Sequence, residues 1–406
     1  MPSDQRSLRK NILLFSLYFL VMFGGMGIIQ PFINLHFREI GFSGVQIGLL
    51  MVVSSFVLIL TAPQYGLLFD NSKNKRQTLL ISAFITTITL VFVPFLRSFA
   101  LVMLLYTCHR VINTTNIAAT ENLSYRVSAG NNSQAKPAFG SLRLWGSLGF
   151  GLTAFAGGYI YEKSGMLTNT WLFLGLMAAA MLIMLMMPGS LFQNGQKEEQ
   201  AEGQLKLGGI LKLIYDDRFL LLTVLALAIT DPLSDGIRSF EPIFMKDLHL
   251  TEGVIGLAAT LSALGEVPLM LWSDRLIDRF GVRKLVLFIL VFDLARRLAV
   301  WFSPSGEMVF AMSVATSVSY ALRLVCTVHL INLRIPQKYT TTAMTFITIT
   351  LNGTFHMLSN AVSGVIYDQY GGRELYLMGA IACLISLAFA LAAGKLEKQA
   401  PSTREA

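Results

Sequence analysis

The feature that most constrains this fold is a series of long apolar runs separated by short polar segments. About 20 apolar residues suffice for a helix to span a bilayer. Twelve such runs begin near Ile12, Val45, Leu79, Leu101, Leu142, Trp171, Leu220, Val254, Leu285, Met308, Ala343 and Tyr376. Only 14% of the 406 residues are charged, against about one quarter in soluble domains. We therefore predict an all-α membrane protein with twelve transmembrane helices.

Lysine and arginine residues are concentrated in the segments on one side of the predicted spans. With the N-terminus in the cytoplasm, cytoplasmic segments hold 21 of them and external loops hold five. The positive-inside rule then predicts a multi-pass protein of the cell (plasma or inner) membrane with both termini cytoplasmic. The same rule explains the sequence pI near 9.4, so we expect no nucleic acid partner. The first run, residues 12–33, is too long for a cleavable signal.

The chain also carries an internal repeat. Residues 193–205 form the only long polar stretch and predict a flexible linker. Glu39, Ile47, Asp70 and Lys75 recur as Asp247, Ile255, Asp278 and Arg283, in each case 208 residues later. We expect residues 1–190 and 218–406 to form two pseudo-symmetric six-helix halves, joined by a cytoplasmic linker over 191–217. Such a duplication, with a polar site between the repeats, is typical of transporters.

Residues 139–150 read FGSLRLWGSLGF and place Arg143 one turn inside a predicted span. Gly146, Ser147 and Phe150 follow at spacings that put them on the same helical face. A charge facing lipid is costly, so Arg143 should face protein or a water-filled cavity. The alternative is an arginine that extends to the headgroups from the start of the helix.

Six acidic and six basic side chains lie within the spans or at their edges. They are Glu121, Asp231, Asp235, Glu241, Glu266 and Asp293, with Arg110, Arg143, Arg238, Arg296, Arg297 and Arg323. Equal numbers indicate pairing, because an unpaired charge inside a membrane is expensive. Asp231, Asp235 and Arg238 form one helical stripe, which is either functional or a set of structural ion pairs.

Glu266 stands alone in the apolar segment LSALGEVPLML. A carboxyl group in such surroundings can exchange a proton near physiological pH, because burial disfavours its charged form. Arg296 on the following span is a plausible partner. The alternative role of Glu266 is an interhelical hydrogen bond.

The loops after the second helix of each half read GLLFDNSKNKR and DRLIDRFGVRK. Both resemble the loop signature of the major facilitator superfamily, a glycine followed by an aspartate four residues on and a basic cluster. The first copy keeps Gly66 and Asp70, and the second has Asp274 in place of the glycine. The resemblance implies that Asp70 and Asp278 act as latches between helices, whereas positive-inside charge alone would not explain the aspartates.

Three further motifs, RLWGSLGF, GEVPLM and LARRL, resemble the branch with lactose permease, phenylpropionate transporters and nucleoside–proton symporters. The resemblance implies that Glu121 and Arg143 hold the substrate, with Phe150 stacking on it. It also implies proton coupling by the acids Glu266, Asp231 and Asp235 and by Arg296. The histidine and glutamate of the branch's tenth helix are missing, and Asn352 replaces an eleventh-helix lysine. His329 or His356 could substitute, although lone histidines in apolar helices usually only pack.

We therefore expect a monomeric symporter that imports a small polar or anionic organic solute with protons and needs no cofactor. The solute would be an organic carboxylate, a sugar or a nucleoside, and Asp293 joins the expected coupling residues. Proton-driven export is the alternative, disfavoured because Thr153 and Ala154 stand where exporters carry glycine and proline. A membrane enzyme is disfavoured because no histidine has an aspartate four or five residues on and no P-loop occurs.

Overall fold

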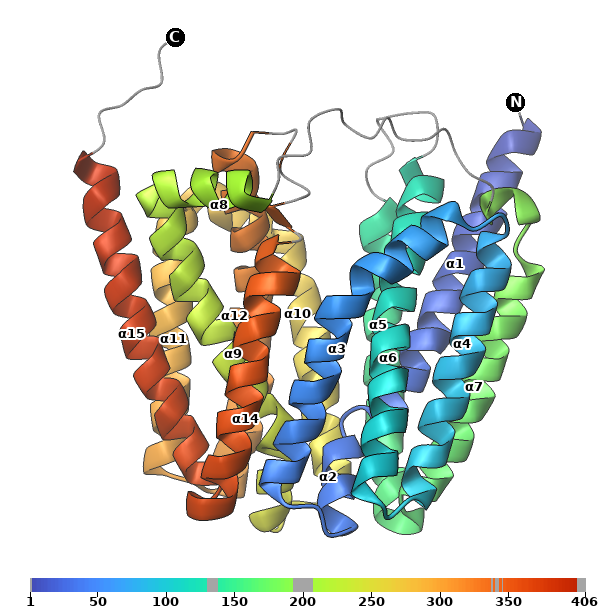
Figure 1. Cartoon of the computed structure of the whole chain (residues 1–406), viewed down its shortest axis with the longest axis horizontal. Coiled ribbons are helices and arrows are strands. Elements are labelled where there is room, and N and C mark those ends of the chain that lie inside the picture. Colours follow the sequence, from blue (N-terminus) through green and yellow to red (C-terminus); the bar gives the residue numbers. More distant parts are fainter. Residues whose placement is uncertain are drawn as a thin grey trace. The chain divides into compact units, whose positions relative to one another are not determined.

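The computed structural model describes residues 2–129, 138–192, 207–336, 339, 343–344 and 346–399 (Figure 1). Every regular element in these ranges is a helix, and they contain no strand. The contacts divide the chain into two compact units. The first unit is Met1–Gln196 with Met245–Leu264, and the second is Lys197–Phe244 with Gly265–Ala406.

In its described residues, the first unit is built from long helices and short helical turns. They are α1 (Pro2–Ile29), α2 (Ile33–Glu39), α3 (Gly44–Asn71), α4 (Lys75–Phe92), η1 (Val93–Phe95), α5 (Phe99–Ala129), α6 (Ala138–Ser164), α7 (Met166–Met186) and η2 (Gly189–Phe192). Helix α1 packs against α6 and α7, whereas α5 packs against α3 and α4. Ser43 caps α3, accepting from the Gln46 N–H while the Gln46 side chain accepts from the Ser43 N–H.

Glycines bring α1 and α6 into backbone contact within this unit. A Cβ atom on Gly149 of α6 would overlap the Leu20 carbonyl oxygen of α1. A Cβ on Gly27 of α1 would likewise overlap the Phe150 carbonyl oxygen. Thr153 adds a hydrogen bond from its Oγ1 to the Gly24 carbonyl oxygen at 2.7 Å. The small residues of the stretch that contains Arg143 therefore pack closely against a neighbouring helix.

The second unit holds most of the remaining helices. They are α8 (Leu207–Asp216), α9 (Arg218–Asp247), α10 (Glu252–Phe280), α11 (Val282–Phe302), α12 (Gly306–Arg334), η3 (Phe346–Leu351, a π-helix), α14 (Asn352–Tyr370) and α15 (Gly372–Gln399). The last residues of α9 and the first half of α10 group with the first unit. Helix α11 packs against α12 and α15, and α14 packs against α15. Figure 1 shows α8 running across the axis of α9.

The predicted all-α membrane fold is confirmed: eleven of the apolar runs fall on long helices, and the described residues of the run from Ala343 include η3 and α14. Among the described residues, eight helical segments are long and apolar enough to cross a membrane, and they lie on α1–α2, α3, α4, α7, α9, α10, α12 and α15. Helices α5, α6, α11 and α14 fall outside this set. In α11 the charged residues Asp293, Arg296 and Arg297 make the helix less apolar. The polar stretch 193–205 lies outside the described residues, and Leu207–Asp216, at the end of the predicted linker, is helical.

Candidate functional site

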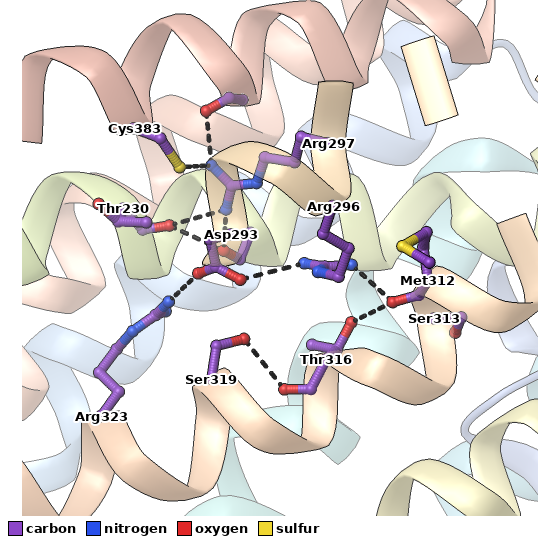
Figure 2. Close-up of polar contacts among 12 residues, drawn as sticks. Thr230, Asp293, Arg296, Arg297, Met312, Ser313, Thr316, Ser319, Arg323 and Cys383 are labelled. Carbon is purple, nitrogen blue, oxygen red and sulfur yellow. Dashed lines mark hydrogen bonds and ion pairs between the residues drawn. The ribbon is translucent and has the colours of Figure 1, made fainter. Parts of the chain in front are cut away.

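A carboxylate between two arginines lies in the interior of the second unit (Figure 2). Asp293 of α11 is completely buried, and its Oδ2 lies 2.5 Å from Nη2 of Arg323 on α12. Its Oδ1 lies 3.5 Å from Nη2 of Arg296, one turn along α11. Arg296 also donates to the Met312 carbonyl oxygen at 2.9 Å. This ion triad holds one negative and two positive charges, so removing Asp293 would leave two buried arginines without a counter-charge.

Arg297, the next residue, joins three helices through uncharged acceptors. Its Nη1 donates to the Gly379 carbonyl oxygen at 2.6 Å and to Cys383 Sγ at 3.0 Å, both on α15. Its Nη2 donates to the Ser234 hydroxyl and to the Thr230 carbonyl oxygen of α9. The side chain is fully buried, and Figure 2 shows its contact with Cys383. We assign Arg297 a structural role, because these contacts connect α9, α11 and α15.

A cavity of about 330 Å³ lies between α9, α12 and the η3–α14 segment of the same unit. Its polar lining residues are Asp235, Arg238, Tyr320, Arg323, Thr327, Asn352 and His356. Its aliphatic lining residues are Val224, Leu227, Ala228, Leu324, Leu330 and Ile347. A concave site with a few convergent polar groups and an apolar wall is the usual form of a small-molecule site.

Two side-chain pairs organise the polar part of the cavity. His356 Nδ1 of α14 lies 3.2 Å from Asp235 Oδ2 of α9. The same oxygen accepts a hydrogen bond from Asn360 Nδ2 at 3.2 Å. The Arg238 guanidinium stacks over the Tyr320 ring, 5.2 Å from its centroid. These pairs place both signs of charge on the cavity wall.

Arg323 connects the cavity to the buried triad. It lines the cavity and also contacts the Asp293 carboxylate, which lies deeper in the unit. A ligand that approaches Arg323 therefore acts on a group whose charge Asp293 balances. This one side chain is therefore shared between the cavity wall and a buried acid.

A second acid of the unit, partly buried, is held by uncharged donors. Glu241 of α9 accepts hydrogen bonds from the Ser313 hydroxyl and the Tyr376 hydroxyl, each at 2.8 Å. These donors come from α12 and α15. Glu241 thus contributes a further polar link between helices.

The structure describes the predicted site residues to different extents. Glu121 on α5, Phe150 on α6 and Glu266 on α10 are partly buried, and Asp278 at the end of α10 is exposed. The backbones of Asp70, Arg143 and Asp231 lie in α3, α6 and α9, and their side chains lie outside the described part of the chain.

The structure brings some predicted residues together with partners that the sequence analysis did not choose. Asp293 and Arg296 form an ion pair, and the cavity residue Arg323 completes the triad. Asp235 pairs with His356, which the sequence analysis raised only as an alternative. His356 and Asn360 are spaced as one helical face of α14, the signal that could have identified this pair. Among the described residues, no group of three or more His, Cys, Asp or Glu side chains is arranged to hold a metal ion.

An all-helical membrane protein with ion pairs beside a polar cavity has the features of a solute transporter. The family model described as MFS_1 like family matches residues 12–378. The chain therefore belongs to this family of the major facilitator type, and it is a transporter rather than an enzyme.

Similar proteins agree with this assignment. The chain is 23% identical over 383 residues to the uncharacterized transporter YwbF of Bacillus subtilis (strain 168), covering 94% of this chain and 93% of that protein. It is 24% identical to the maltose permease of Geobacillus stearothermophilus, covering 97% and 96%. The crystal structure of the nucleoside transporter NupG matches with a TM-score of 0.79 at 14% identity. That match covers 95% of this chain and 99% of the other and shows the shared fold.

Proposed function

We propose that the protein is a secondary active transporter that imports a small polar or anionic organic solute together with protons. It would work by alternating access as a monomer in the cell membrane, with both termini in the cytoplasm. The excess of lysine and arginine on one side of the spans supports this orientation. The repeated motifs support a division into halves over 1–190 and 218–406.

The observation that carries the proposal is the position of Arg323 between Asp293 and the cavity. A proton on Asp293 removes the charge that holds Arg323, so Arg323 becomes a better partner for a solute. Linkage makes the effect reciprocal, since a solute that draws on Arg323 raises the affinity of Asp293 for a proton. Two ligands that favour each other's binding in this way are the requirement for symport.

The other expected residues keep their proposed roles. Glu121, Arg143 and Phe150 would contact the solute. Glu266, Arg296, Asp231 and Asp235 would contribute to proton coupling, with His356 as the partner of Asp235. Asp70 and Asp278 would act as latches at the ends of their helices.

A proton gradient should drive accumulation that depends on these acids. Proteoliposomes with an alkaline interior are offered a panel of carboxylates, sugars and nucleosides. We expect uptake of a panel member by the intact protein, and in Glu266→Gln we expect loss of accumulation with retained downhill exchange. The reason is that glutamine keeps the size and hydrogen-bonding shape of glutamate but cannot take up and release a proton by titration.

The matched control is Glu307→Gln, which changes a carboxylate at the first turn of α12. This variant should accumulate solute like the intact protein. Gradient-driven extrusion from preloaded vesicles would instead support export and contradict the import direction. Equal accumulation by Glu266→Gln and the intact protein would remove Glu266 from the coupling residues.

A further inference from the structure

One arginine of the predicted spans has no role in the site described above. Arg110 lies in α5 of the first unit, 11 residues after the first residue, Phe99, and 19 residues before the last, Ala129. Its Cα is therefore about 16 Å along the helix from the nearer end. A charge in such a position is costly in lipid, so the guanidinium must face either the protein or water.

The Arg110 side chain points between helices. Its Nη1 contacts Sδ of Met51 on α3 at 2.7 Å, and Met51 is only 3% exposed. The preceding residue, His109, is held on the side of α4, where its Nδ1 lies 2.9 Å from the Thr86 carbonyl oxygen. Arg110 remains partly exposed. One edge of its guanidinium therefore rests on α3, and the exposed part belongs in a space that water reaches.

No carboxylate contacts Arg110 among the described residues. Helices α3 and α4, which pack against α5, hold one acidic residue, Asp70, which follows Met51 by 19 residues or about 28 Å along α3. The acid of α5 itself is Glu121, 11 residues or about 16 Å from Arg110. The Met51 thioether is uncharged and accepts hydrogen bonds weakly. Arg110 therefore keeps its charge and most of its five donors for another partner.

We propose that Arg110 binds the anionic group of the solute. The inference rests on the proposed function and narrows its solute class to organic anions, because the planar guanidinium fork matches a carboxylate. The contact with Met51 positions the guanidinium before the solute arrives, which lowers the entropy cost of binding.

This contact is separate from the one proposed for Glu121. The two residues lie on one face of α5 but about three turns apart, so one small solute does not touch both at once. With both termini in the cytoplasm, α5 begins at the external side. A solute that enters from outside therefore reaches Arg110 before Glu121.

The first test measures the electrostatic potential beside Arg110 and needs no known solute. Thr114→Cys places a thiol one turn along the same face of α5, at an exposed position, in a chain that also carries Cys108→Ser. The full chain in nanodiscs reacts at low salt with an anionic sulfonatoethyl and a cationic trimethylammonioethyl methanethiosulfonate. Adding Arg110→Gln should lower the ratio of the anion rate to the cation rate about tenfold, the effect in water of removing a unit charge about 6 Å away.

Two variants control this measurement. Arg110→Lys keeps the charge and should keep the rate ratio. Arg97→Gln changes an exposed arginine just before α5 and should leave the ratio unaltered. A thiol that reacts with neither reagent, or a ratio that Arg110→Gln leaves unchanged, would overturn the inference, because the guanidinium would then not face water.

The second test asks which solutes depend on Arg110. Proteoliposomes with an alkaline interior are offered benzoate, hexanoate, maltose or uridine at low concentration. We expect uptake of a carboxylate that falls at least tenfold in Arg110→Gln, since a hydrogen bond to a charged group contributes about 1.5–3 kcal/mol. Arg110→Lys should recover part of this uptake, because it restores the charge without the fork.

The outcomes separate this inference from the proposed function. Gradient-driven uptake of maltose or uridine alone would uphold proton symport and overturn the anion contact. Carboxylate uptake that needs Arg110 but ignores the proton gradient would uphold the anion contact and contradict symport. Equal carboxylate uptake by Arg110→Gln and the intact protein, or uptake of none of the four solutes, would overturn the inference.

Discussion

Replacing Asp293 by alanine is expected to destabilise the protein by about 3–5 kcal/mol, because the change leaves buried arginines without their counter-charge. Asp293 is fully buried and contacts both Arg296 and Arg323. The loss should appear as a lowered midpoint of thermal unfolding for the purified protein in detergent. Transport should be lost as well, since Arg323 would no longer be held at the cavity wall.

The control for this prediction is an ion pair at the surface. Asp217 lies 3.5 Å from Arg334, and both side chains are about a third exposed or slightly less. Asp217→Ala should therefore cost about 0–1 kcal/mol. The double variant Asp293→Ala with Arg323→Met should recover part of the lost stability, because it removes one of the stranded charges. If Asp293→Ala lowers the stability of the protein no more than Asp217→Ala does, the ion triad does not stabilise the unit as described.

Gly149→Ala is expected to cause the second large effect, by separating α1 from α6. A Cβ on Gly149 would overlap the Leu20 carbonyl oxygen, which belongs to the backbone and cannot rotate away. Overpacking of a tight interface typically costs about 1–3 kcal/mol, and more where the backbone must shift. The thermal unfolding midpoint and the yield of folded protein should both fall.

Gly175 on α7 provides the matched control. A Cβ built there meets nothing within 4 Å, so Gly175→Ala introduces the same methyl group without a clash. This variant should be neutral or slightly stabilising, because alanine favours helix over glycine by up to about 1 kcal/mol. If the two variants unfold at the same temperature, the α1–α6 contact is not tight.

The helices could be predicted from the sequence because a bilayer leaves backbone polar groups few alternatives. Any apolar run of sufficient length must pair its own N–H and C=O groups, and a helix does so within the segment. The runs that begin near Leu101, Leu142 and Leu285 were therefore identifiable even though interior charges make α5, α6 and α11 less apolar. Glycine–backbone contacts such as Gly149 against Leu20 depend on helix register and were not predictable.

The residues of the ion triad could also be identified from the sequence, whereas the contacts among them could not. Hydropathy reveals that Asp293, Arg296 and Arg323 lie within spans, since each interrupts an apolar run. The rotation and axial position of α11 and α12 decide that Asp293 contacts Arg323, and short-range sequence patterns carry no information on either. The expected pairing of Arg296 with Glu266 remains a prediction.

His356 illustrates the same limit. A single histidine in an apolar helix usually packs without any titrating role, and the spacing of His356 and Asn360 marks a polar face of α14 without identifying its partner on another helix. Its partner Asp235 lies more than 100 residues earlier in the chain and meets it only because α9 and α14 are neighbours in the folded unit. The cavity likewise forms only where α9, α12 and the η3–α14 segment pack together, so it could not be predicted from the sequence.

The contacts of Arg297 have a mechanical consequence. The Arg297 side chain of α11 donates hydrogen bonds to the Gly379 carbonyl oxygen of α15 and to the Ser234 hydroxyl of α9. We therefore expect α9, α11 and α15 to move together. Conformational change in this unit should then fall on η3 and α14, because α12 is also held to α11 by the Asp293–Arg323 ion pair. Spin-label distances among α9, α11 and α15 should stay constant through a transport cycle, while distances from α9 to α14 should change.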